Sequence, residues 1–175
     1  MNLPLWITLS RLLGVPFLLY LLFDPTPIQR WWSLGIFLLA ATTDWVDGYL
    51  ARRRNEVTDL GKFLDPLVDK LLILAPLLCL VGLGSIPAVG VFLIVARELG
   101  IAGWRVNQAK IRGANIWGKL KTVAQVVAVA LLVAPLPEIW RLPALAMFWI
   151  AVLLTVISGF VYILPRQSAD STQRS

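Results

Sequence analysis

The sequence contains no histidine among its 175 residues and only one cysteine, Cys79. The absence of histidine excludes metal sites with imidazole ligands and any catalytic base of that type. A single cysteine cannot form a disulfide within the chain, and its place in an apolar run indicates a packing residue. A metal site in this chain would therefore rely on oxygen ligands.

Charged residues are also scarce, at 15% of the chain, whereas hydrophobic residues make up 58%. A soluble domain carries about 25% charged and about 45–50% apolar residues. Apolar runs approach the roughly 20 residues needed to cross a bilayer, and they recur along the whole chain. There is no linker-like segment, and residues 3–23 lack the features of a cleaved signal peptide. We therefore expect one membrane domain over residues 1–175.

Turn-forming segments divide the apolar sequence into six parts. Proline and glycine cluster at residues 24–27, 82–87 and 135–137, where they favour chain reversals. The fold class predicted is an all-α integral membrane protein with six transmembrane helices in one bundle. The expected spans are about 5–23, 32–52, 63–83, 86–106, 117–134 and 142–164.

Basic residues are distributed unevenly between the predicted loops. With six spans both termini lie on one side, and that side holds nearly all of the Lys and Arg, while the other holds only Arg30 and Arg141. The positive-inside rule then places both termini and the basic loops in the cytoplasm, in the inner (plasma) membrane. The net charge of +6 indicates an anionic membrane surface or phosphorylated substrates, and no nucleic acid.

Four carboxylates interrupt the apolar sequence on either side of the second predicted loop. They form two pairs with helical spacing, Asp44 with Asp47 and Asp65 with Asp69, so each pair shares a helix face. The short loop makes their helices antiparallel neighbours, with Asp44 and Asp69 roughly 10 Å inside the helix ends. Four ionised acids at one point require cations, and oxygen ligands suit two Mg²⁺ or Mn²⁺ ions. In the alternative interpretation, these acids pair with nearby cations of the interface: residues 52–54, Lys62 and Lys70.

The residues around these acids match a family pattern. The segment DWVDGYLAR at 44–52, followed after eight residues by GKFLDPLVD at 61–69, resembles the signature of the CDP-alcohol phosphotransferases. The resemblance implies that the four aspartates hold two metal ions on the CDP pyrophosphate, that Asp69 is the catalytic base and that CMP leaves. It also implies a homodimer. The residues expected at the CDP site are Gly48, Ala51, Arg52 and Gly61.

Further cations in or near the spans suggest that the acceptor alcohol is anionic. The segments NLP at 2–4, ARE at 96–98 and ANIWGKLKT at 114–122 resemble the bacterial phosphatidylglycerophosphate synthase branch of this family, although Leu5 stands where that branch is expected to carry Asn. The resemblance implies CDP-diacylglycerol as donor and sn-glycerol 3-phosphate as acceptor. The candidate ligands of the acceptor phosphate are Arg11, Arg97, Lys119 and Lys121.

Simpler interpretations of these cations remain open. Lys119 and Lys121 are also typical of positive-inside anchors, and Arg11 could extend to the interface. Arg97 and Glu98 are adjacent, and neighbouring side chains on a helix point about 100° apart. We therefore predict that these two residues do not simply neutralise each other.

Alternative functions also remain at this stage. The same chemistry with another acceptor would make a cardiolipin, phosphatidylserine or phosphatidylinositol-phosphate synthase. A Mg²⁺-dependent membrane prenyltransferase normally carries two separate Asp-rich motifs, whereas this chain has one. A divalent-cation transporter would place its acids nearer the bilayer midplane, and it would have no use for the Gly48, Ala51 and Arg52 positions.

Overall fold

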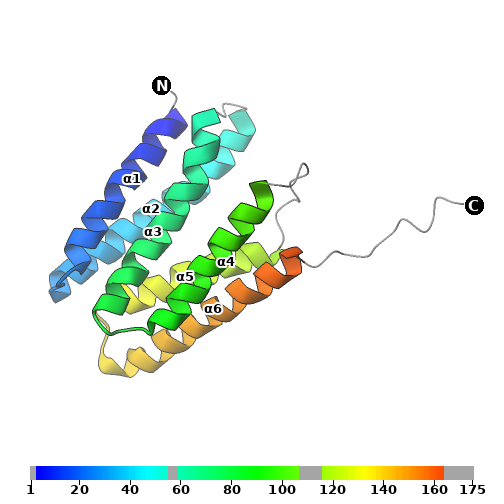
Figure 1. The fold of residues 1–175 in the computed structure, drawn as a ribbon. Helices are drawn as coiled ribbons and strands as arrows, with labels where there is room; N and C mark the ends of the chain where they lie inside the picture. Colours follow the sequence, from blue (N-terminus) through cyan, green and yellow to red (C-terminus); the bar gives the residue numbers. More distant parts are fainter. Residues whose placement is uncertain (1–2, 55–58, 107–115, 164–175) are drawn as a thin grey trace, which may run out of the picture.

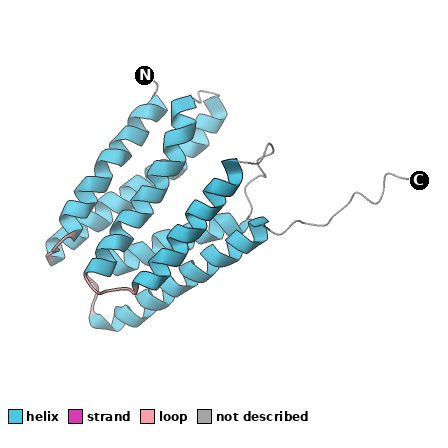
Figure 2. Ribbon diagram, viewed as in Figure 1, coloured by secondary structure: helices cyan, strands magenta, loops and turns pink. Residues whose placement is uncertain are grey.

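The computed structural model describes the backbone of residues 3–54, 59–106 and 116–163, and the side chains within 10–43, 67–103 and 116–162. Over these residues all regular secondary structure is helical, with six α-helices and one short 3₁₀ turn joined by short loops (Figures 1 and 2). The elements are α1 (Leu3–Leu22), α2 (Pro27–Arg54), α3 (Asp59–Gly82), α4 (Ala88–Val106), α5 (Ile116–Val133), η1 (Glu138–Trp140) and α6 (Arg141–Ile163).

The six expected helices are therefore confirmed as helices, but α2 begins five residues earlier than predicted. The reason is a capping box. The Gln29 backbone N–H donates to Thr26 Oγ1 at 3.3 Å, and the Thr26 N–H donates to Gln29 Oε1 at 2.8 Å. Pro27, at the first helical position, has its φ already suited to the helix. The signal lies in the sequence TPIQ at 26–29, whose first two residues belong to the predicted turn at 24–27.

The helices pack as two groups of three that run side by side (Figure 1). In the first group, α1 packs on both α3 and α2; in the second, α6 packs on both α5 and α4. Contacts of α5 with α2 and α3, and of α4 with α3, join the groups. Leu18, Phe37, Leu80 and Phe148 lie fully buried in the shared core. Cys79 is partly buried against this core, as expected of a packing residue.

Large apolar side chains cover the outside of the bundle as well as its inside. Leu13, Leu39 and Leu142 are each more than 70% exposed, and exposed apolar residues occur on all six helices. Among the described side chains, the helical segments 116–133 and 138–162 are long and apolar enough to cross a bilayer. Such extensive exposed apolar surface is rare on soluble monomers and is typical of a surface that meets lipid.

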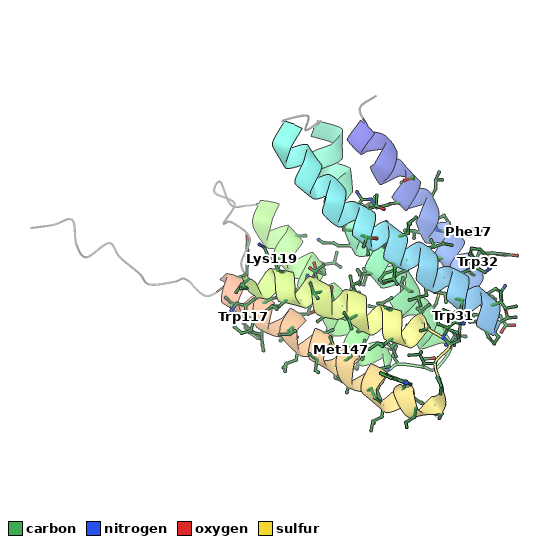
Figure 3. The ribbon with its side chains drawn as sticks, turned by 180° about the vertical axis from the view of Figure 1, so that it is seen from behind. Phe17, Trp31, Trp32, Trp117, Lys119 and Met147 are labelled. Atoms are coloured by element: carbon green, nitrogen blue, oxygen red, sulfur yellow. The ribbon has the colours of Figure 1, made fainter. Side chains whose placement is uncertain are left out.

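Tryptophans mark both ends of the bundle. Trp31 and Trp32 on α2 lie at the opposite end from Trp117 and Lys119 on α5 (Figure 3). Trp31 and Trp32 are 56% and 66% exposed. Exposed tryptophan at both ends is the distribution expected where a membrane protein meets the two lipid–water interfaces.

Candidate active site

The four aspartates of the sequence motif lie on the helical hairpin formed by α2 and α3. Asp44 is ten residues before the end of α2 and Asp69 is ten residues after the start of α3. At 1.5 Å per residue both lie about 15 Å from the connection, rather than the expected 10 Å, because both helices extend further than predicted. Asp47 and Asp65 lie at nearly matching depths, seven and six residues from the same helix ends. The two pairs are therefore level along the hairpin.

Only Asp69 has its side chain among those that the structure describes. Its Oδ1 accepts a hydrogen bond from Arg11 Nη1 of α1 at 3.0 Å. The Arg11 side chain is 5% exposed, whereas that of Asp69 is 42% exposed. The pair combines an inaccessible cation with an accessible carboxylate, so Asp69 keeps a surface on which a metal ion or a substrate can bind.

The side chains of Asp44, Asp47 and Asp65 lie outside the described set, so their convergence on Asp69 stays a prediction. No group of three or more potential metal ligands occurs among the side chains that are described. The same holds for the expected CDP site: Gly48, Ala51, Arg52 and Gly61 are placed by their backbone alone, within the helix turns nearest the α2–α3 connection.

A second group of charges, here termed the Glu98 cluster, consists of Arg97, Glu98 and Lys121. Arg97 Nη1 donates to Glu98 Oε1 at 3.0 Å, and Lys121 Nζ donates to the same oxygen. All three side chains are at most 14% exposed. The prediction that Arg97 and Glu98 do not neutralise each other was wrong. Their long side chains bend together at the tips although their Cα–Cβ bonds diverge.

The Glu98 cluster carries more positive than negative charge. Lys70, the residue after Asp69 on α3, lies near enough to Glu98 and Lys121 to interact electrostatically with both. Even without Lys70, two cations, Arg97 and Lys121, face the one carboxylate of Glu98. Burying excess charge is costly unless a counterion is present. The arrangement therefore favours the binding of an anion. Because Lys70 follows Asp69 in the sequence, this cluster lies on the Asp69 side of the bundle.

The four residues predicted for the acceptor phosphate thus occupy three positions. Arg97 and Lys121 are brought together through Glu98, which sequence reasoning had not assigned to the site. Arg11 contacts Asp69. Lys119 is exposed near the start of α5 (Figure 3), two residues before Lys121. Helix packing was needed to separate these groups, because the sequence indicates only that each is a cation near one face of the membrane.

Known proteins with similar sequences identify the family to which this chain belongs. Residues 1–157 match the CDP-alcohol phosphatidyltransferase family. The chain is 42% identical to the CDP-diacylglycerol–glycerol-3-phosphate 3-phosphatidyltransferase of Bacillus subtilis, over 92% of this chain and 93% of that protein. It is 31% identical to the Haemophilus influenzae protein of the same name, over 93% and 91% of the two chains.

A probable phosphatidylglycerophosphate synthase of Mycobacterium tuberculosis is 39% identical, over 93% of this chain and 80% of the mycobacterial protein. All four aspartates and the whole Glu98 cluster fall inside the matched region, residues 1–157. On this evidence the chain belongs to the CDP-alcohol phosphatidyltransferase family.

Proposed function

We propose that this protein transfers the phosphatidyl group of CDP-diacylglycerol to sn-glycerol 3-phosphate, which gives phosphatidylglycerophosphate and CMP in phospholipid biosynthesis. The observation that carries the proposal is that the relatives above are named for this reaction and align with more than 90% of the chain. The excess of buried cations in the Glu98 cluster agrees with an acceptor that carries its own phosphate.

The donor set fits a pair of divalent metal ions. Asp44, Asp47, Asp65 and Asp69 supply hard oxygen ligands from two helices, level along one hairpin, and such ligands select Mg²⁺ or Mn²⁺. Two such ions, when bound, stabilise the charge on the pyrophosphate and on the departing CMP. Gly48, Ala51, Arg52 and Gly61 line the CDP site in this proposal.

Asp69 acts as the general base. Its carboxylate accepts the proton of the acceptor hydroxyl, whose oxygen forms the new bond to the lipid-bearing phosphorus. The bond between that phosphorus and the bridging oxygen of the pyrophosphate breaks, and CMP leaves with both electrons. The buried Arg11 at 3.0 Å holds the Asp69 carboxylate in place. The Asp69 side chain is 42% exposed, so an acceptor hydroxyl can approach it.

The acceptor is oriented by its phosphate. Arg97 and Lys121 form the centre of this subsite, with Lys119 at the exposed start of α5 and Arg11 toward Asp69. Fixing a substrate at its far end raises the rate because the reacting hydroxyl no longer has to be found by diffusion. Lys70, the residue after Asp69, lies near enough to Glu98 to interact with it electrostatically.

The protein works in the membrane that holds its lipid substrate. We propose six transmembrane spans, with the termini and a polar active-site cavity on the cytoplasmic side of the inner membrane, and a homodimer. Exposed apolar residues on all six helices support the spans. The basic residues near Lys119 and the α2–α3 connection support the orientation. No nucleic-acid partner is part of the proposal.

The test is CMP release by the purified, detergent-solubilised protein with CDP-diacylglycerol and Mg²⁺. Glycerol 3-phosphate, serine, inositol phosphate and phosphatidylglycerol are each supplied as the sole acceptor, and Asp65→Asn is the inactive control. We expect release with glycerol 3-phosphate alone. Release with a different acceptor would keep the chemistry but change the product. No release from folded protein would favour a prenyltransferase or a cation transporter.

A further inference from the structure

Glu98 lies at the centre of the cation cluster, yet the proposed reaction gives it no step. We infer that Glu98 is a positioning residue: its carboxylate holds Arg97 and Lys121 in the arrangement that receives the acceptor phosphate, and Gly159 leaves the space that Arg97 needs. This inference rests on the proposed function and adds two residues to its acceptor subsite.

The first argument is that Glu98 connects two helices that are not close neighbours. α4 and α5 are not among the closely packed helix pairs, and each packs instead on α3 and α6. The side chains of Glu98 and Lys121 nevertheless meet between them. A guanidinium from α4 and an ammonium from α5 therefore converge on one carboxylate oxygen. Without that carboxylate the two cations would repel each other and separate.

The second argument concerns the packing of Arg97 against α6. A Cβ added at Gly159 would lie 3.0 Å from Arg97 Cγ and 3.5 Å from Arg97 Nε. Most other glycines that the structure describes have open space at this position, so the close approach at Gly159 is specific. The stem of Arg97 thus lies directly on the α6 backbone, and any side chain at 159 would shift it.

The third argument is that the cations of the Glu98 cluster outnumber its one carboxylate, since Arg97 and Lys121 share Glu98. Arg97 Nε is buried without a hydrogen-bond partner among the described residues and lies beside Gly159, so the phosphate contact falls to the other guanidinium nitrogens. Burying an excess of positive charge is costly without a counterion, so the cluster favours an anionic ligand. A phosphate has oxygens enough to accept from the guanidinium and from the Lys121 ammonium together.

Glu98→Gln tests the inference because it keeps the size of the side chain and removes its charge. With less to hold the two cations together, we expect the KM for glycerol 3-phosphate to rise at least about tenfold. The KM for CDP-diacylglycerol should stay within about twofold, and Glu98→Asp should restore part of the loss. Glu138→Gln is the matched control, since Glu138 also accepts from an arginine at 3.0 Å but is 82% exposed at the other end of the bundle.

Gly159→Ala is the second variant, which moves Arg97 without changing any charge. We expect the KM for glycerol 3-phosphate to rise about fivefold or more here, and to stay unchanged in Gly100→Ala, where the added methyl group meets nothing within 4 Å. If Glu98→Gln does not fold, Gly159→Ala alone decides the inference.

Two outcomes would overturn it. One is an unchanged KM for glycerol 3-phosphate in folded Glu98→Gln. The other is an unchanged KM for glycerol 3-phosphate in Gly159→Ala. A lower melting temperature with both KM values unchanged in Glu98→Gln is a case of the first outcome and would make Glu98 only a structural bridge. Failure of the proposed function looks different, because the wild-type protein would then release no CMP with glycerol 3-phosphate.

Discussion

Two arginine–carboxylate contacts of equal length, 3.0 Å, occur in the two halves of this bundle and differ in almost everything else. At Arg11–Asp69 the cation is buried and the carboxylate is 42% exposed. At Arg97–Glu98 the carboxylate is 12% exposed and Lys121 joins it. The accessible carboxylate can exchange a proton or bind a metal ion. The enclosed one can only hold its cations, whose excess charge then attracts an anion. In the proposed mechanism, this difference in exposure separates the carboxylate that acts as the base from the one that positions cations.

The largest effect is expected from Asp69→Asn, which removes the proposed proton acceptor and one proposed metal ligand. Turnover in the CMP-release assay should fall about 10²–10⁴-fold. Binding of CDP-diacylglycerol in the presence of Mg²⁺ separates the two roles, because loss of the base alone leaves it intact. Near wild-type turnover with normal binding would show that Asp69 is not the base. The greater exposure of its carboxylate would then have no catalytic role.

Arg11→Gln tests whether Arg11 serves Asp69 or the acceptor phosphate. If it serves Asp69, kcat should fall about 10–100-fold, as is usual when the partner of a functional carboxylate is lost, while the KM for glycerol 3-phosphate changes little. A raised KM with normal kcat would instead assign Arg11 to the acceptor phosphate. The measurement is the initial rate of CMP release as glycerol 3-phosphate is varied.

Lys121→Gln should weaken binding of the acceptor at the Glu98 cluster. It removes one charged donor to the phosphate, worth about 1.5–3 kcal/mol, so the KM for glycerol 3-phosphate should rise by roughly 10–100-fold. Arg141→Gln at the opposite end of the bundle, where Arg141 is 71% exposed, serves as the control. A shift in the KM for CDP-diacylglycerol of the same size would contradict the assignment of Lys121 to the acceptor.

The smallest effect is expected at the capping box of α2, which lies away from both charge groups. Thr26→Ala removes the acceptor for the Gln29 N–H and should lower the free energy of unfolding by about 1 kcal/mol. Thermal unfolding in detergent measures the loss. The kinetics of CMP release should not change at a temperature where the variant is folded. A changed KM would mean that the start of α2 affects the geometry of the active site.

The aspartate motif and the six α-helices of the described residues could both be predicted from the sequence alone. Helical spacing places Asp44 with Asp47 and Asp65 with Asp69 on shared faces whatever surrounds them, because the periodicity of a helix is local. Apolar runs bounded by proline and glycine define the helices for the same reason. The early start of α2 could also have been predicted, since its capping box lies within four consecutive residues.

The pairing of the charges could not be predicted in this way. Glu98 and Lys121 are 23 residues apart, and Arg11 and Asp69 are 58 apart, so their contacts depend on how the helices pack. Gly159 has no sequence signal at all, since its role appears only where Arg97 crosses α6. Local spacing by itself determined which aspartates share a helix face. Only the tertiary structure decided which carboxylate is accessible and which is enclosed by cations, because both depend on side chains contributed by helices distant in the sequence.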